Sequence, residues 1–130
     1  MKASPLSDLS APAKSVLVFG VYLLLLGALL VVAPNVVLGL FGIPPATEVW
    51  IRVVGMLVLV LGAYYALAAI AEVRAFMRWT VPIRLCVLLF FAAFVVTGLA
   101  PRVLILFGLV DVAGAAWTAW ALRRAAAQDL

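Results

Sequence analysis

Asp111 is the side chain best placed to do chemistry, because it is a carboxyl group in the middle of a long apolar run. A helix over that run, Val103–Leu122, would put Asp111 about 12 Å deep in a hydrocarbon core about 30 Å thick. A carboxylate at that depth is costly unless it is paired, solvated or protonated. Its helical stripe also holds Gly108, Ala115 and Thr118, which favours close helix contact. We therefore expect Asp111 to point into a bundle of helices.

Two arginines inside other apolar runs are candidate partners for Asp111. Arg52 enters from the same predicted end and leaves an axial gap of about 7 Å, whereas Arg84 enters from the opposite end and leaves about 10 Å. Depth therefore favours Arg52, although Glu48 lies four residues before it and could engage it locally. Thr118 adds a hydroxyl to the same candidate intramembrane polar site. The choice between the two arginines stays open.

Two interpretations of this polar site also stay open. In the first, the charged and hydroxyl groups form a structural clamp that fixes the register of the helices. In the second, Asp111 lies on a proton or substrate pathway and changes its protonation as an ion or ligand arrives. The residue types alone permit both.

Four further polar side chains lie inside the apolar runs and could line a ligand site: Tyr22, Tyr64, Tyr65 and Thr97. Their hydroxyl groups could bind a quinone or a lipid headgroup. The alternative is that each hydroxyl bonds a neighbouring backbone or side-chain group, as buried tyrosines usually do.

The chain lacks the residues that several enzyme classes need. It has no histidine and one cysteine, Cys86, so a His-containing zinc site, a bis-His haem and CxxC thiol exchange are excluded within one chain. It has no phosphate-binding glycine loop and no GxSxG nucleophile motif. We therefore expect no catalytic residues, no metal site, no cofactor and no enzymatic activity. The net charge of +4 comes from scattered basic residues, a pattern typical of membrane-span flanks rather than of nucleic-acid binding.

Long apolar segments must position these residues. Of the 130 residues, 69% are hydrophobic and 11% are charged, too few for the surface of a soluble domain. We predict a four-helix membrane domain over residues 15–124, between a flexible cytoplasmic tail at 1–14 and a second tail at 125–130. Its spans are predicted at 15–33, 49–71, 80–99 and 103–122. Residues 36–43 are apolar but too short to cross, and are either interfacial or re-entrant.

The predicted fold class is all-α, a bundle of four transmembrane helices. Residues 33–42 and 100–108 resemble each other around an Ala-Pro pair, which is consistent with two related helical hairpins. Glycines recur on the first two predicted spans, at Gly20 and Gly27 and at Gly55 and Gly62. We expect these small residues to let the helices pack closely.

Orientation follows from the distribution of Lys and Arg. Seven basic residues fall on one predicted side of the membrane and two, Arg52 and Arg102, on the other. The basic side is expected to be cytoplasmic, so both termini would be cytoplasmic. Tryptophans fit this orientation, with Trp79, Trp117 and Trp120 at the inner interface and Trp50 at the outer one.

Three polar anchors carry a resemblance to a known group. They are EVWIRVVG at Glu48–Gly55, RWTVPIR at Arg78–Arg84 and LFGLVDVAG at Leu106–Gly114. With the four-span pattern, they make the chain similar to small bacterial membrane proteins of the DoxX-like four-helix group. Some members of that group are associated with quinone-linked redox chemistry, but this chain has no redox motif to carry an enzymatic role. The resemblance therefore implies at most an accessory subunit in the bacterial inner membrane. Small multidrug transporters have a similar size, but they need a glutamate in the first span, and this first span has no acid.

We therefore expect a small, multi-pass, non-enzymatic accessory or interaction subunit. Its expected partners are the lipid bilayer and either further copies of itself or a larger membrane complex, with no nucleic acid. The alternatives are a small proton-coupled transporter and a quinone- or lipid-binding protein, each using Asp111 with Arg52 or Arg84.

Overall fold

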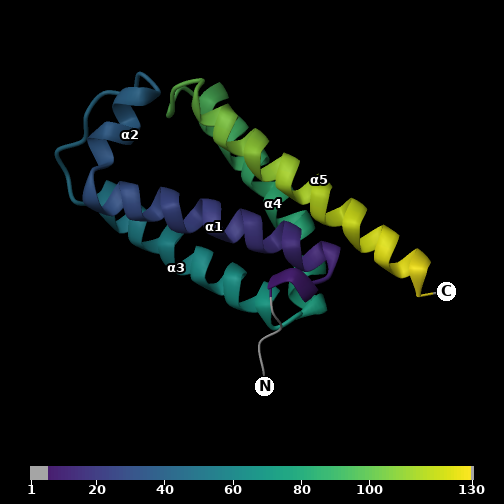
Figure 1. Ribbon diagram of the computed structural model, residues 1–130. Helices are drawn as coiled ribbons and strands as arrows, with labels where there is room; N and C mark the ends of the chain where they lie inside the picture. Colours follow the sequence, from purple (N-terminus) through teal and green to yellow (C-terminus); the bar gives the residue numbers. More distant parts are fainter. Residues whose placement is uncertain (1–5, 130) are drawn as a thin grey trace. The chain divides into compact units, whose positions relative to one another are not determined.

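The computed structural model describes residues 6–129, and within that range the regular structure is helical. A 3-10 helix at Leu6–Asp8 is followed by α1 (Ala11–Val32), α2 (Pro34–Leu40), α3 (Trp50–Ile70), α4 (Arg74–Val96) and α5 (Leu104–Gln128) (Figure 1). Four of these helices, α1, α3, α4 and α5, are long and apolar enough to cross a membrane. The predicted all-α class with four candidate spans is therefore confirmed.

The helix ends differ from the predicted spans where hydrogen bonding, rather than hydropathy, decides them. Helix α1 begins at Ala11 instead of residue 15, because the Ser10 hydroxyl accepts a hydrogen bond from the Ala13 N–H at 3.2 Å and caps the first turn. The predicted N-terminal tail is therefore partly helical over its described part. Residues 1–5, which include Lys2, and residue 130 lie outside the described residues.

Helices α4 and α5 extend past the apolar runs into charged sequence. Helix α4 begins at Arg74 instead of residue 80, directly after a turn in which Glu72 has a φ of 55°. Its C-terminus lies at Val96, where Gly98 with a φ of 79° lets the chain turn away. Helix α5 continues to Gln128 and so includes most of the predicted C-terminal tail. Hydropathy located the apolar part of each helix but not its polar extension.

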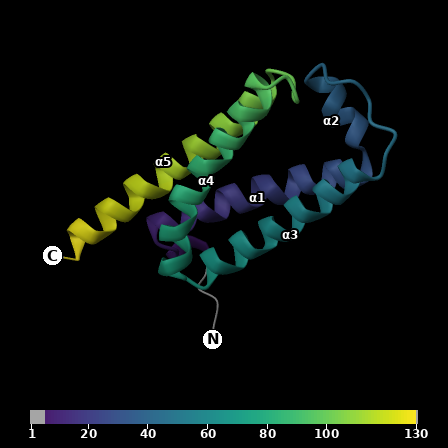
Figure 2. The same cartoon turned by 180° about the vertical axis from the view of Figure 1, so that it is seen from behind.

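The chain divides into two compact units, residues 17–67 and residues 1–16 together with 68–130. In the first unit, the segment of α1 after Val16 lies beside α3 (Figures 1 and 2). A Cβ atom at Gly27 would lie 2.4 Å from the backbone nitrogen of Leu59, and one at Gly62 would lie 2.8 Å from that of Leu24. The two backbones therefore approach too closely for any side chain at these glycines, which confirms their predicted packing role.

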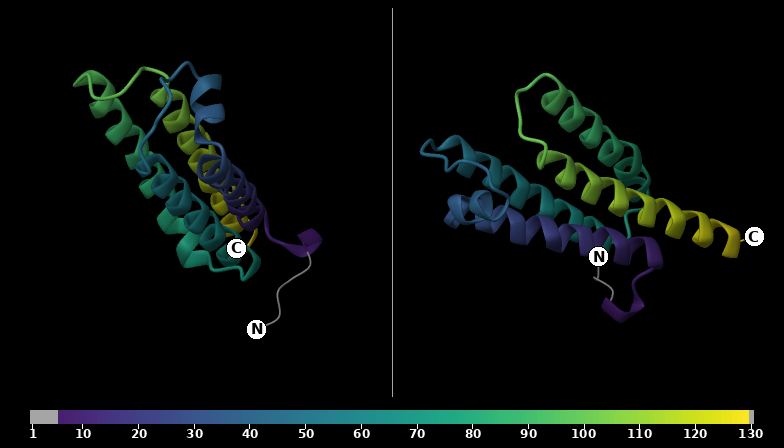
Figure 3. Two further views of the ribbon diagram at one scale, coloured as in Figure 1. Left: turned by 90° about the vertical axis from the view of Figure 1, so that its left-hand side faces the viewer. Right: turned by 90° about the horizontal axis from the view of Figure 1, so that it is seen from above.

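In the second unit, α4 and α5 form an antiparallel hairpin (Figure 3). Gly108 of α5 faces α4, where a Cβ atom would lie 3.2 Å from the Cα of Leu88. The first turns of α1 belong to the same unit, and Ala13 and Val16 are fully buried there. The buried part of this unit includes side chains from α1, α4 and α5: Ala13, Ser15, Val16, Met77, Thr80, Arg84, Ala115, Thr118 and Ala121.

Replacement of Gly27 by alanine tests the close packing of α1 on α3. The added methyl group must push the Leu59 backbone away, so we expect the free energy of unfolding to fall by about 1–3 kcal/mol. Thermal unfolding in detergent measures the effect. Gly39→Ala is the matched control, because nothing lies within 4 Å of a Cβ atom at Gly39. Equal melting temperatures for the two variants would contradict the packing.

Candidate functional site

The guanidinium group of Arg84 is the centre of the polar site in the second unit. Arg84 lies in α4 and is only 1% exposed. Its Nη2 donates to the hydroxyl of Thr80 at 3.0 Å, one helical turn earlier, and to the hydroxyl of Thr118 in α5 at 2.8 Å. Its Nε also donates to the Thr80 carbonyl oxygen at 3.3 Å. One buried cation therefore bonds both helices of the hairpin.

A third helix joins this site through Ser15. The hydroxyl oxygens of Ser15 and Thr118 lie 2.8 Å apart, and Ser15 donates its own proton to the Pro12 carbonyl oxygen at 2.7 Å. Because a hydroxyl has a single proton, Thr118 must be the donor in its bond to Ser15. The bonds therefore run in one direction, from Arg84 through Thr118 and Ser15 to the Pro12 carbonyl.

We call Arg84, Thr80, Thr118 and Ser15 the Arg84 network. All four side chains are 4% exposed or less. The remaining hydroxyl proton, that of Thr80, goes to the Met77 carbonyl oxygen at 2.8 Å. Every hydroxyl in the network thus donates and accepts, which is what a polar group in an apolar interior requires.

Asp111 lies in α5, two turns before Thr118, and is partly buried. Arg84 belongs to the same unit as Asp111. Whether Asp111 pairs with Arg84 or with Arg52 stays a prediction, because the depth of a residue along a helix does not give the direction of its side chain.

Arg52 belongs to the other unit and has a different set of contacts. Its Nη1 donates to the carbonyl oxygens of Val31 and Val32 at the end of α1, the second at 3.3 Å. The final carbonyls of a helix have no partner within it, so a guanidinium group there satisfies them. Arg52 acts as a C-terminal cap for α1, so its hydrogen bonds go to backbone oxygens of α1, whereas the sequence had suggested Glu48 as its local partner.

The four predicted ligand-lining residues are not gathered into one site within either unit. Tyr22 and Tyr65 belong to an aromatic cluster around Phe19, with ring centroids 5.5 Å from the Phe19 ring in both cases. Tyr64 is 61% exposed on α3. Thr97 lies in the other unit, where its hydroxyl donates to the Ala93 carbonyl oxygen at 2.7 Å.

Sequence reasoning missed two members of the Arg84 network. Thr80 precedes Arg84 by four residues, the spacing at which two side chains on a helix meet, and that spacing could have identified it. Ser15 was placed at the very start of the first span, where a hydroxyl is unremarkable. No local signal links Ser15 to Thr118, because the contact joins residues 103 positions apart.

The chemistry of the network is that of a hydrogen-bonded cation. Among the described residues, no group of three or more His, Cys, Asp or Glu side chains could hold a metal ion. Comparisons with protein-family models, with curated proteins and with solved structures found no match to this chain. The site is therefore interpreted from its own contacts.

Thr118→Val tests the network, because valine keeps the shape of threonine and removes its hydroxyl. Arg84 and Ser15 then each lose a buried partner, and we expect the free energy of unfolding to fall by about 1–3 kcal/mol. Thr97→Val is the control, since the exposed Thr97 hydroxyl bonds only its own helix. Thermal unfolding in detergent compares the two. A loss no larger than that of Thr97→Val would refute the role of the network.

Proposed function

We propose that this chain is a non-enzymatic, multi-pass protein of the bacterial inner membrane that acts as an accessory or interaction subunit. The observation that supports this proposal most is the bonding of Arg84. A buried arginine that serves transport must be able to exchange partners, whereas the Arg84 side chain is committed to hydroxyls of its own fold on α4 and α5. The structural-clamp interpretation of the polar site fits these bonds best.

The outer face of α4 supports an interaction role. Phe90 and Phe94 are both exposed, with ring centroids 6.4 Å apart. Ile83, Cys86 and Leu89 are exposed on the same helix. Such an apolar surface contacts either lipid tails or another membrane helix. We propose that part of it contacts a second copy of this chain.

The direction of insertion in this proposal follows the basic residues. Lys14, Arg74, Arg78, Arg123 and Arg124 all belong to one unit and flank the beginning of α1, the beginning of α4 and the end of α5. By the positive-inside rule this end is cytoplasmic, and so are both termini. The similarity to the DoxX-like group is consistent with an accessory subunit and stays a prediction.

Self-association can be tested with the single native cysteine. If α4 faces its copy, mild oxidation of native membranes should link Cys86 to Cys86 and give a disulfide dimer. The control moves the cysteine to an exposed position on α1, in the double variant Cys86→Ser, Leu25→Cys, which should remain monomeric under the same oxidation. A protein that shows no dimer and purifies from native membranes as a lone monomer would contradict the proposal.

A proton-coupled carrier is the second candidate, and one observation favours it. Asp111 is a partly buried carboxyl group in the first third of α5, in the same unit as Arg84. A carboxyl group there could bind and release a proton as a substrate passes. The accessory role does not require an ionisable group at this position.

Asp111→Asn distinguishes the two functions, because asparagine keeps the size and polarity of the side chain but cannot ionise. The accessory role predicts an unchanged proton leak in proteoliposomes and unchanged oligomer formation. The carrier role predicts that a flux present in the wild type is lost while the variant stays folded. A wild-type flux above that of empty liposomes, absent in the variant, would therefore favour the carrier.

A further inference from the structure

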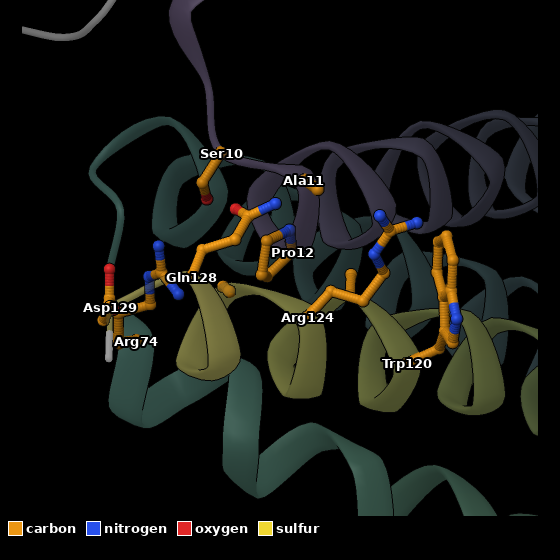
Figure 4. A pocket seen from close by; sticks show the side chains of 10 residues that line it. Ser10, Ala11, Pro12, Arg74, Trp120, Arg124, Gln128 and Asp129 are labelled. Carbon is orange, nitrogen blue, oxygen red and sulfur yellow. The ribbon is translucent and has the colours of Figure 1, made fainter.

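A cavity of about 290 Å³ opens in the second unit where α1 and α4 begin and α5 ends. Its polar wall includes Arg74 from α4 and Arg124 and Gln128 from α5, together with Ser10 and Asp129 (Figure 4). Pro12 of α1 and the ring of Trp120 form part of the apolar wall. None of these residues takes part in the Arg84 network through its side chain.

Arg124 is held in place by an aromatic ring. Its guanidinium carbon lies 5.0 Å from the centroid of the Trp120 ring, within the range of a cation-π interaction. Stacking leaves the N–H groups at the edge of the guanidinium plane able to donate. A cation fixed in this way binds an anion with less loss of side-chain entropy than a free arginine.

Arg74 supplies a second positive charge on the other side of the cavity. It also lines a neighbouring cavity of about 450 Å³, whose wall includes Arg78. Asp129 lines both cavities and, among the described residues, is the one acidic residue in the wall of either. It lies beside Arg74 and away from Arg124 in Figure 4. The positive charges therefore exceed the negative one around the opening.

The beginning of α1 forms the remaining wall and is pinned to the turn before α4. The backbone N–H of Ser10 donates to a carboxylate oxygen of Glu72 at 2.9 Å, and the Ser10 hydroxyl donates to the other oxygen. Both carboxylate oxygens of Glu72 therefore accept hydrogen bonds from Ser10. These bonds also fix Pro12 opposite α5, so the cavity is built before any ligand arrives.

The cavity lies where the helices change from apolar to charged sequence. Trp117 and Trp120 are both exposed on α5, and tryptophan is the residue that membrane interfaces favour. Arg123 and Arg124 follow about one helical turn after Trp120. At this level of a bilayer the abundant anions are the phosphate groups of lipids.

We propose that the cavity binds a phosphate group, with Arg74 and Arg124 as its cationic ligands and Gln128 as a further donor. Guanidinium groups suit this ligand because their paired N–H groups match two phosphate oxygens. The position at the interface favours the phosphodiester of an anionic phospholipid, and inorganic phosphate shares the same chemistry. The site goes beyond the proposed accessory role and depends on neither Asp111 nor the Arg84 network.

Native mass spectrometry of the full-length protein in detergent tests this site by titration with phosphatidylglycerol and, separately, with phosphatidylcholine. The wild type should retain phosphatidylglycerol in preference to phosphatidylcholine. The double variant Arg74→Gln, Arg124→Gln should bind phosphatidylglycerol about tenfold more weakly or worse, since two charge-assisted contacts are lost. Arg123→Gln is the control for the Arg124 half of the double variant, because it removes one positive charge at the neighbouring position, which does not line the cavity. It should change the affinity by less than about twofold.

Inorganic phosphate separates the two sources of the ligand. If millimolar phosphate raises the melting temperature of the wild type but not of the double variant, the site takes free phosphate as well as lipid. If phosphatidylglycerol raises the melting temperature of the wild type and inorganic phosphate does not, the phosphodiester and its glycerol are both required.

Equal weakening of phosphatidylglycerol binding by Arg123→Gln and by the double variant would overturn the site in favour of a diffuse surface charge. Equal retention of the two lipids by the wild type would also overturn it. Melting without lipid verifies that each variant is folded.

Discussion

The guanidinium group of Arg84 imposes the main constraint on the second unit, because a cation that is 1% exposed among apolar helices must be hydrogen-bonded by the fold around it. Its bond to Thr118 holds α4 and α5 in one register, and its bond to Thr80 fixes the guanidinium group on α4. The bond from Thr118 to Ser15 extends the same constraint to the first turns of α1. A slip of one residue between these helices would leave a buried charge without its partners, so the network specifies the packing as well as stabilising it.

The other unit obtains its register by a different physical means. Between α1 and α3 the contacts are backbone against backbone, at Gly27, Gly55 and Gly62, and they depend on the absence of side chains. Lipid tails are as apolar as leucine, so close van der Waals packing and internal hydrogen bonds must replace the hydrophobic effect between membrane helices. The chain uses close van der Waals packing between α1 and α3, and internal hydrogen bonds in the unit that contains Arg84.

Hydropathy was enough to locate the long helices and to identify Asp111, Arg84 and Thr118 as polar groups inside them. It could not predict that α1 begins at Ala11, because a serine cap carries no hydropathy signal. The choice of Arg52 or Arg84 as the partner of Asp111 stays a prediction, since it depends on the direction of a side chain and on which helix lies opposite. Ser15 became part of the site only through a contact with the far end of the chain. The location in a bacterial inner membrane and the identity of partners stay predictions.

A double-mutant cycle between Arg84 and Thr118 measures the central interaction most directly. Arg84→Met keeps much of the apolar stem and removes the charge, so Thr118→Val should cost less in that background, where only the bond from Thr118 to Ser15 is lost. The account predicts a coupling energy of about 1–2 kcal/mol between the two positions, obtained from thermal unfolding of the four proteins in detergent. Additive effects, with Thr118→Val equally damaging whether or not Arg84 is present, would contradict a clamp built on this hydrogen bond.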